Sequence, residues 1–481
     1  MPCPTPVSAR EASAANDGVD PRIWTIAWVV LLGPLMTSLD STVVNVSLGR
    51  LGQELHAPLT TIQWVISGYL LALALILPLC GWLVDRVGAK RVYLGCFTAF
   101  TAASMACGLA ASAAALIGFR VLQGMAGGLL VPMAQLMTAR GAGRQMARIM
   151  GLMSMPVLLG PICGPALAGF ILQHASWRWI FFINLPIGLL ALLLAIWILP
   201  RDDGLARPRP FDLAGFAMLS PGLALLLHSL ESLGAGRSAH HLAWLELAAA
   251  LGLLAAFLRH GRRLGGAALV DLRLFRRPAF AAAACTQFLA NAGAIGGQML
   301  LALCLLMARR STPAQAGMLL VPIGLGMFCS LPAMGRLTGW FGPRRVAAAG
   351  ALLALAGTLP FAWAGFAAGP AWLLCIALFV RGMGQGGIAI PSIAVAYEAI
   401  PGAQIPVATT AINIVQRLGG PVAATALALF LHTRMGAVAP GLPLGPVFAA
   451  TFRLLCALHV VTLLAALRLP AWPGPAQAIE R

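Results

Sequence analysis

Charged side chains are scarce in this sequence, and acidic side chains are the scarcest. Asp, Glu, Lys and Arg make up 10% of the 481 residues, and only 14 residues are Asp or Glu. Soluble domains carry about 25% charged residues, so this chain has too little charge to cover a water-facing surface. Hydrophobic residues supply 60% of it. Lipid is therefore the expected solvent for most of the chain, which excludes a soluble enzyme.

Several chemical signatures are missing as well. The ten cysteines include no CxxC pair and no Cys/His cluster, so we expect neither a metal site nor a disulfide framework. The chain has no GxxxxGK[ST] sequence, which leaves ATP-driven pumping without support. A membrane-embedded enzyme would need clustered His, Asp or Glu at the membrane surface, and none is found. We therefore predict no catalytic residue, no metal and no cofactor.

The net charge of +18 would suit a nucleic-acid partner, but its distribution argues against one. Most of the 32 Lys and Arg residues lie in short segments between apolar runs, where cations set orientation in a membrane. The partners expected are therefore the lipid bilayer, protons and a small-molecule substrate, without nucleic acid. The sequence does not indicate whether a periplasmic adaptor is needed.

Apolar runs long enough to cross a bilayer follow one another along the chain. A span needs about 20 mainly apolar residues. The sequence predicts fourteen such spans, at about 24–48, 62–83, 92–113, 115–138, 149–172, 179–199, 211–230, 242–258, 278–305, 315–335, 345–366, 371–395, 407–431 and 447–468. The run from Trp24 to Leu48 is too long for a signal-peptide core, so it is interpreted as an uncleaved first span.

An even number of spans puts both termini on one side of the membrane. Because most cations then fall on the side of the N-terminus, the positive-inside rule makes that side the cytoplasm. We predict a multi-pass protein of the bacterial inner membrane with both termini cytoplasmic.

One cationic, glycine-rich turn occurs twice in the chain. The two copies are Gly81-Trp-Leu-Val-Asp85-Arg86-Val-Gly88-Ala-Lys90-Arg91 and Gly335-Arg-Leu-Thr-Gly339-Trp-Phe-Gly342-Pro-Arg344-Arg345. Their glycines are 254 residues apart (335 − 81 and 342 − 88). Repeated halves in a membrane protein are typical of transporters, in which two similar bundles rock about a site between them.

The repeat divides the fourteen predicted spans into six, two and six. We predict an all-α membrane protein with two pseudo-symmetric six-helix bundles. Its parts are a cytoplasmic tail at 1–23, a first bundle at 24–199, an inserted hairpin with a basic cytoplasmic linker at 200–277, a second bundle at 278–468 and a cytoplasmic tail at 469–481.

The first copy of the turn is interpreted as a gating motif. Gly81 and Gly88 permit a tight turn and close helix approach. Asp85 is able to accept hydrogen bonds from a neighbouring helix N-terminus or to pair with an arginine. The cations Arg86, Lys90 and Arg91 are expected among the lipid headgroups. The alternative is an orientation signal with a turn glycine.

These residues resemble the loop 2–3 signature of the major facilitator superfamily, and four further segments resemble its motifs in order. Leu39-Asp40-Ser-Thr-Val-Val-Asn45-Val looks like the first-span motif of the fourteen-span drug:proton antiporter branch. Arg120-Val-Leu-Gln123-Gly124 resembles the RxxQG motif, and Gly160-Pro161-Ile-Cys-Gly164-Pro165 resembles the GPxxGG antiporter motif, with Pro165 where the family usually has Gly. Trp177-Arg-Trp-Ile-Phe-Phe-Ile-Asn184-Leu-Pro186-Ile-Gly188 is also typical of that branch. The resemblance implies the major facilitator fold and proton-coupled transport.

Asp40 is the most informative single residue. An ionisable side chain deep in a span costs several kcal/mol, so it faces a polar cavity or a partner. At about 1.5 Å per residue, Asp40 and Arg120 both fall in the outer half of their spans. We hypothesise that Asp40 alternates between proton and substrate in a polar chamber between the halves, with Arg120 adjusting its affinity for protons. The alternative is a fixed structural salt bridge.

Small residues form a stripe in the fifth span. Gly160, Gly164 and Ala168 recur every four residues, a spacing that favours close helix packing. Pro161 and Pro165 remove backbone donors and bend the helix. The stripe suits a sliding surface between bundles, and static packing explains it equally well.

The second half carries two arginines near the predicted bilayer midplane, Arg381 and Arg417. Such arginines face a cavity or pair with carbonyls. We predict a candidate substrate cavity lined by Asn45, Gln123, Arg381, Asn413, Gln416 and Arg417.

Together these features predict a proton-coupled secondary transporter that exports hydrophobic or amphipathic compounds by alternating access, a drug or multidrug:proton antiporter. One alternative is a dedicated transporter of a single metabolite, such as an organic acid or a siderophore. A gated channel is disfavoured because the chain has no filter motif.

Overall fold

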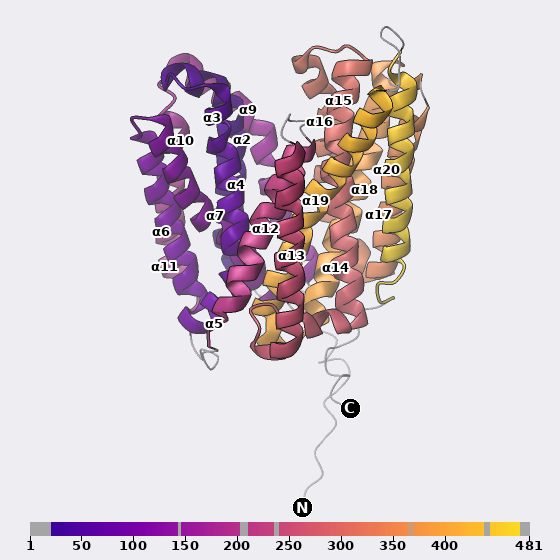
Figure 1. The fold of residues 1–481 in the computed structure, drawn as a ribbon. Coiled ribbons are helices and arrows are strands. Elements are labelled where there is room, and N and C mark those ends of the chain that lie inside the picture. The colour runs from indigo at the N-terminus through magenta and orange to yellow at the C-terminus, as the bar shows by residue number, and fades with distance from the viewer. Residues whose placement is uncertain are drawn as a thin grey trace, which may run out of the picture.

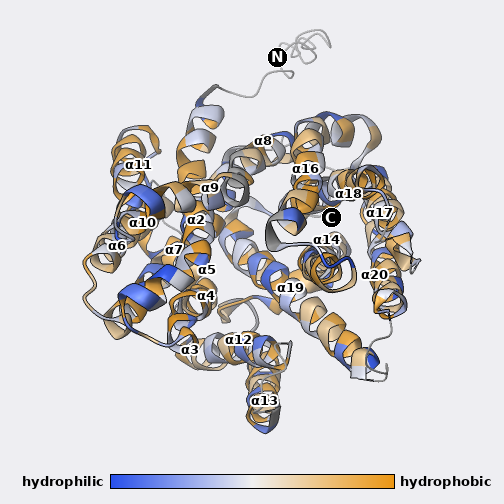
Figure 2. Ribbon diagram, turned by 90° about the horizontal axis from the view of Figure 1, so that it is seen from above, coloured by the Kyte–Doolittle hydropathy of each residue, from blue (hydrophilic) through white to orange (hydrophobic). Residues whose placement is uncertain are grey.

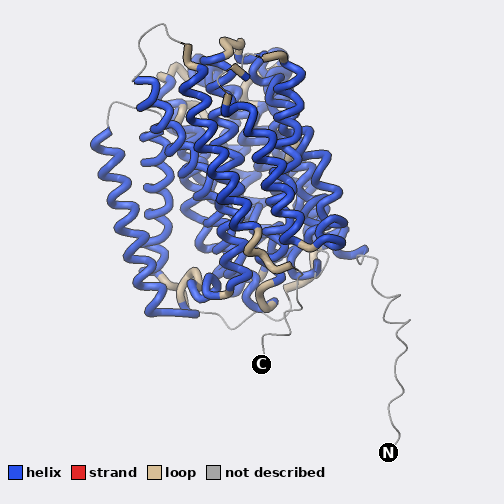
Figure 3. The backbone as a smooth tube through the Cα atoms, turned by 90° about the vertical axis from the view of Figure 1, so that its right-hand side faces the viewer, coloured by secondary structure: helices blue, strands red, loops and turns tan. Residues whose placement is uncertain are grey.

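Helices account for all of the regular structure in the computed structural model of the chain. It describes residues 21–142, 146–202, 210–234, 240–363, 365–366, 369–436 and 443–471. Over these residues Figure 3 shows helices joined by loops and no strand. The predicted all-α architecture is therefore confirmed.

The helices gather into two groups, the first and the second bundle. A hairpin lies beside the seam, which is the interface between the two bundles (Figure 1). The first group contains α2 (Pro21–Glu54), α3 (Leu59–Ile62), α4 (Trp64–Ile76), η1 (Leu77–Leu79), α5 (Cys80–Val87), α6 (Ala89–Gly108), α7 (Ala113–Ala142), α8 (Met146–Val157), α9 (Leu159–His174), α10 (Trp179–Phe182) and α11 (Asn184–Ile198). The hairpin and the linker after it contain α12 (Leu213–Gly234), α13 (His240–Leu264), η3 (Gly265–Ala267) and η4 (Leu272–Arg276).

The second group begins with a helix that changes its winding twice. It contains α14 (Pro278–Asn291), η5 (Ala292–Gly296), α15 (Gly297–Leu303), η6 (Cys304–Ala308), α16 (Pro313–Phe341), α17 (Pro343–Thr358), η7 (Leu359–Ala362), α18 (Ala371–Glu398), η9 (Gly402–Gln404), α19 (Ile405–Gly436) and α20 (Gly445–Ala466). Both η5 and η6 are π-helical, a winding often found at functional sites.

Within the described residues, twelve helical stretches are long and apolar enough to cross a membrane. Two of the fourteen predicted spans are not among them. The segment at 92–113 lies on α6, whose first turn carries the polar Lys90 and Arg91. The segment at 149–172 is divided at Leu158 between α8 and α9, because Pro156 and Pro161 on either side have no N–H for helical bonds. The arrangement of six, two and six spans stays a prediction.

Both copies of the repeated turn adopt the same backbone geometry. The glycine after α5 is Gly88, with φ 99°, and the glycine after α16 is Gly342, with φ 81°. In each copy the next helix begins at the following residue. Glycine reaches positive φ without the steric cost that other residues meet. The sequence repeat is therefore a structural repeat.

The two bundles contact each other near one end of the molecule, where α2 begins and α20 ends (Figure 1). Here α5 packs on α19, and α8 packs on α16 and α18. Hydrogen bonds also cross the seam. Gly81 N donates to Thr410 Oγ1 at 2.9 Å. Gln135 Oε1 accepts from Asn413 Nδ2 at 2.8 Å and from the Tyr397 hydroxyl at 3.3 Å.

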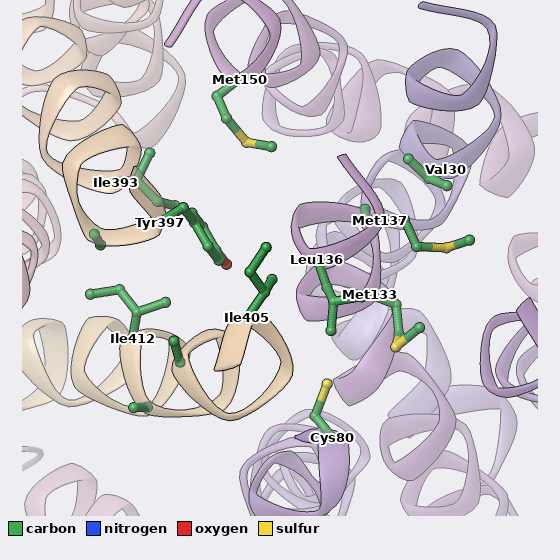
Figure 4. Packing of buried hydrophobic residues seen from close by; sticks show 14 of the residues in the cluster. Val30, Cys80, Met133, Leu136, Met137, Met150, Ile393, Tyr397, Ile405 and Ile412 are labelled. Atoms are coloured by element: carbon green, nitrogen blue, oxygen red, sulfur yellow. The ribbon is translucent and has the colours of Figure 1, made fainter. Parts of the chain in front are cut away.

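Apolar side chains fill the rest of this contact. Cys80, Met133 and Leu136 of the first bundle lie opposite Ile405 and Tyr397 of the second (Figure 4). All five belong to a single buried cluster, so the core is continuous across the seam at this end.

The first glycine of each repeat copy allows the bundles to approach closely. A methyl group at Gly81 would lie 3.1 Å from the Pro406 carbonyl oxygen, and one at Gly335 would overlap the backbone of Arg148. Gly81 belongs to the first bundle and meets the second, whereas Gly335 belongs to the second and meets the first. Small residues at such positions permit close backbone packing.

The hairpin covers one side of the seam. Helix α12 packs on α4 of the first bundle and on α19 of the second, and α13 stands outside it (Figure 2). The hairpin therefore bridges the two bundles at this side.

The glycine contact at Gly335 yields a structural prediction. We expect Gly335→Leu to separate α8 from α16, because the new side chain has no space beside Arg148. Distances between spin labels at exposed Arg91 and Arg345 should then increase relative to the unsubstituted protein. The matched control is Gly339→Leu, one turn along α16, where nothing lies within 4 Å. Equal distances in both variants would contradict the prediction.

Candidate functional site

A buried ion pair joins α2 to α7. Asp40 Oδ2 lies 2.6 Å from Arg120 Nη1, and the two residues are 2% and 1% exposed. The pairing that the sequence predicts is therefore present. Removing one partner of such a buried pair typically costs about 3–5 kcal/mol, because the other charge is left uncompensated.

Side chains of other helices complete the hydrogen bonding of the Asp40 carboxylate. Its Oδ1 accepts from Asn184 Nδ2 of α11 at 2.9 Å and from Gln123 Nε2 of α7 at 3.1 Å. Asn184 Nδ2 also donates to the Ser104 hydroxyl of α6 at 3.0 Å. The Arg120 guanidinium and both amides donate to the carboxylate, so each of its oxygens has a hydrogen-bond partner.

Arg120 is held from three further directions. Its Nε donates to the Val65 carbonyl oxygen at 3.1 Å, and Nη1 donates to Gln123 Oε1 at 2.8 Å. The guanidinium lies 4.1 Å from the ring centroid of Tyr69, a cation–π geometry. The Tyr69 hydroxyl is buried and has no hydrogen-bond partner among the described residues.

The expected position of Asp40 between the halves is wrong. All of its partners belong to the first bundle, and it is not among the residues that line the cavity between the bundles. The physical reason is that Arg120, Gln123 and Asn184 enclose it completely inside one bundle. Asp40 therefore faces neither lipid nor the central cavity in this conformation.

A cavity of about 640 Å³ lies between the bundles beside α12. Its walls come from α4, α7 and α12 on one side and from α14, η5, α15 and α19 on the other. Three of the predicted cavity residues line it: Asn413, Gln416 and Arg417. Arg417 Nε is buried without a hydrogen-bond partner among the described residues.

Tyr69 connects the ion pair to this cavity. The Tyr69 ring lies against the Arg120 guanidinium, with 4.1 Å between the guanidinium carbon and the ring centroid. The next residue along α4, Leu70, lines the cavity. The wall that carries Tyr69 therefore separates the buried pair from the space between the bundles.

Three other predicted cavity residues lie elsewhere. Gln123 belongs to the Asp40 network, and Asn45 is an exposed residue of α2. Arg381 is buried inside the second bundle, where Nη2 donates to the Gly293 carbonyl of η5 at 2.8 Å. None of the three lines the cavity described above, because span position gives the depth of a residue but not the direction in which its helix face points.

The charged residues of the first copy of the repeated turn lie in different environments. Asp85 is buried and lines a small pocket with Val407 of the first turn of α19. Lys90 Nζ donates to the carbonyl oxygens of Ile196 at 2.7 Å and Leu199 at 2.8 Å. The open carbonyls at the end of α11 thus bind the Lys90 ammonium. Arg86 and Arg91 are exposed.

The small stripe of α9 packs on the segment of α2 that carries Asp40. Side chains at Gly160 or Gly164 would overlap Ser38 or Thr42, and the Thr42 hydroxyl donates to the Gly160 carbonyl at 3.1 Å. Pro161 lies in the first turn of α9, and Pro165 is an exposed residue inside the helix. The stripe thus lies inside the first bundle rather than between the bundles.

Sequence reasoning missed three polar residues of the site. Asn184 lies in a segment that resembles a family motif. A polar amide beside the membrane core could have indicated that it belongs to the site. Gln135 and Glu231 gave weaker signals, since one is a lone amide in an apolar helix and the other is near a span end. Glu231 lines the cavity from α12 and accepts from the Ser67 hydroxyl at 3.1 Å.

Comparison with known proteins places this architecture in a family. The model of the Major Facilitator Superfamily matches residues 30–424. The multidrug resistance protein B homolog of Mycobacterium tuberculosis (strain ATCC 25618 / H37Rv) is 34% identical over 457 residues, which cover 92% of this chain and 84% of that protein. The putative multidrug resistance protein MdtD of Klebsiella pneumoniae (strain 342) is 35% identical over 362 residues, 74% of this chain and 75% of that protein.

Solved structures share the fold at low sequence identity. The human organic anion transporter MFSD10 gives a TM-score of 0.66 at 17% identity, over 93% of this chain and 100% of that one. The proton:xylose symporter XylE gives 0.65 at 14% identity, over 93% and 95%. With its two bundles, its repeated turn and a family match over most of its length, this chain belongs to the major facilitator superfamily.

Proposed function

We propose that this protein is a proton-coupled multidrug exporter that works by alternating access. It has fourteen spans arranged as six, two and six, as in the drug:proton antiporter branch. It lies in the bacterial inner membrane with both termini in the cytoplasm. Relatives that cover most of the chain are named as multidrug resistance proteins, which supports this function over transport of one dedicated metabolite.

The buried pair of Asp40 and Arg120 carries the proposal of proton coupling. A carboxylate that is enclosed in protein at membrane depth is costly unless it is paired, so it is a functional candidate by default. When Asp40 takes up a proton, it loses its charge and its attraction to Arg120. The guanidinium is then left without a counter-charge inside the bundle. Protonation therefore changes which arrangement of α2 and α7 is the more stable.

The contact between the bundles supplies the second state of the cycle. The seam is closed at the end where α2 begins, and the cavity extends from Asn413 toward Gly234 at the far end of α12. With cytoplasmic termini, this is an outward-facing conformation. Opening the opposite way requires the Gln135 and Gly81 hydrogen bonds across the seam to break. An Asp40 proton binds from outside and leaves inside, while the substrate moves outward.

The cavity suits amphipathic compounds. Leu70, Leu227 and Met299 supply apolar contact, and Met side chains adapt to ligands of different shape. Glu231 of α12 places a negative group on one wall of the cavity. Arg417 of α19 places a positive group on the opposite wall. Such a lining accepts a hydrophobic body with either sign of charge.

Neutralising the carboxylate tests the coupling. We expect Asp40→Asn to reduce export driven by a pH gradient by about tenfold or more, a factor that corresponds to about 1.4 kcal/mol in the barrier. Exchange of labelled for unlabelled substrate without a pH gradient should continue, because it needs no net proton movement. Both are measured with purified protein in liposomes.

The matched control for Asp40→Asn is Glu54→Gln. Glu54 lies on the same helix and pairs with Arg50 at the surface, with the two side chains 41% and 54% exposed. It should export at the rate of the unsubstituted protein. Full pH-driven export by Asp40→Asn would end the proposal, as would loss of exchange together with export in a variant that unfolds at the usual temperature.

The cavity charges predict a change in substrate preference. We expect Glu231→Gln to raise the KM for a lipophilic cation several-fold, since a partly exposed ion pair contributes up to about 1 kcal/mol, and to leave a neutral compound unchanged. Arg417→Gln should instead raise the KM for a lipophilic anion. Glu246→Gln is the control, because Glu246 pairs with His228 at 2.8 Å and is not among the described residues that line the cavity. Equal effects on cation, anion and neutral compound would contradict this assignment.

A further inference from the structure

A second cavity lies between the hairpin and the second bundle. It has a volume of about 930 Å³ and is enclosed by α12, α13, the linker and α19. It differs from the cavity between the bundles, with which it shares none of its described lining residues.

The walls of this groove are apolar. Leu219 and Leu223 line it from α12, Leu254 and Phe257 from α13, and Leu418 from α19. Helix α13 packs mainly on α12 and the linker. Only 17% of the most apolar stretch of this helix is buried in protein, the lowest share among the twelve candidate spans. The gap between α13 and α19 is therefore not filled by protein. Inside a bilayer, an apolar gap of this size is a place for lipid chains.

The mouth of the groove is strongly cationic. Arg262 lies at the end of α13, and Arg273 and Arg276 lie on η4 of the linker, all three exposed. No Asp or Glu is among the described residues that line the groove. The nearest linker acid, Asp271, accepts from the backbone N–H of Arg273 at 2.9 Å, which caps η4. Three cations thus face the groove mouth without a carboxylate partner in its lining.

The spacing of mouth and wall matches a lipid. Arg262 and Leu254 are eight residues apart on α13, so the groove runs about 12 Å along the helix from the cations into the apolar zone. The linker end is also the end where α2 begins and α20 ends (Figure 1), the cytoplasmic end in the proposed orientation. Basic pockets between helices at this level recognise anionic lipid headgroups.

We propose that this groove binds one anionic phospholipid of the inner leaflet. Its phosphate lies among Arg262, Arg273 and Arg276, and its acyl chains lie against the leucines of α12 and α13. The lipid completes the packing between the hairpin and α19. This proposal does not depend on Asp40 or on the transported compound.

Retention of lipid by the purified full-length protein tests the proposal. Phosphatidylglycerol or phosphatidylethanolamine is added, and bound lipid is measured by native mass spectrometry. We expect the protein to retain one phosphatidylglycerol molecule in preference to phosphatidylethanolamine. The triple variant Arg262→Gln, Arg273→Gln and Arg276→Gln should bind it at least about tenfold more weakly. The double variant Leu223→Trp and Leu254→Trp keeps the cations but fills the groove, so it should also lose the lipid.

The matched control removes the same charge elsewhere at this end of the molecule. It is the triple variant Arg263→Gln, Arg344→Gln and Arg345→Gln, whose three arginines are exposed and are not among the groove residues. It should retain phosphatidylglycerol like the unsubstituted protein. The proposal is overturned by equal retention of phosphatidylethanolamine, by an equal loss in this control, or by unchanged binding in the tryptophan variant. Thermal unfolding in detergent identifies any variant that fails to fold.

Discussion

The structure depends on one ion pair that is enclosed in protein and surrounded by lipid. Neither Asp40 nor Arg120 has access to water in this conformation, so each is stable only because the other is present. The amides of Gln123 and Asn184 fix the carboxylate in place, and these side chains come from helices far apart in the sequence. The first bundle is therefore organised around one buried pair of opposite charges.

The two halves share a backbone plan but not this chemistry. Arg381 occupies the predicted fourth span of its half, as Arg120 does, and it is just as buried. Its guanidinium donates to a carbonyl of the π-helical η5, while Nε and Nη1 have no partner among the described residues. The π-helical η5 thus presents the Gly293 carbonyl oxygen to the arginine, where the first half presents the Asp40 carboxylate. Among the described residues, the first half therefore has the Asp40 carboxylate beside its arginine, and the second half has a backbone carbonyl.

Much of the fold could be predicted from sequence because lipid leaves the chain few options. Apolar runs of sufficient length must be helical, and the repeated glycines at positions 88 and 342 mark the same turn twice. The pairing of Asp40 with Arg120 could also be predicted, since two isolated charges at similar depth need each other. What sequence does not give is the direction of each helix face. Asn45 and Arg381 are polar and central in their spans, yet one is exposed and the other is enclosed in a bundle.

The hairpin has a consequence for how the seam between the bundles meets the bilayer. Helix α12 bridges α4 and α19, whereas on the opposite side α8 lies directly on α16, and Figure 2 shows no further described helix outside that contact. In a protein of two matched halves, the seam would have two equivalent lateral openings toward the bilayer. Here α12 covers one of these two openings, so the two sides of the seam meet the bilayer differently.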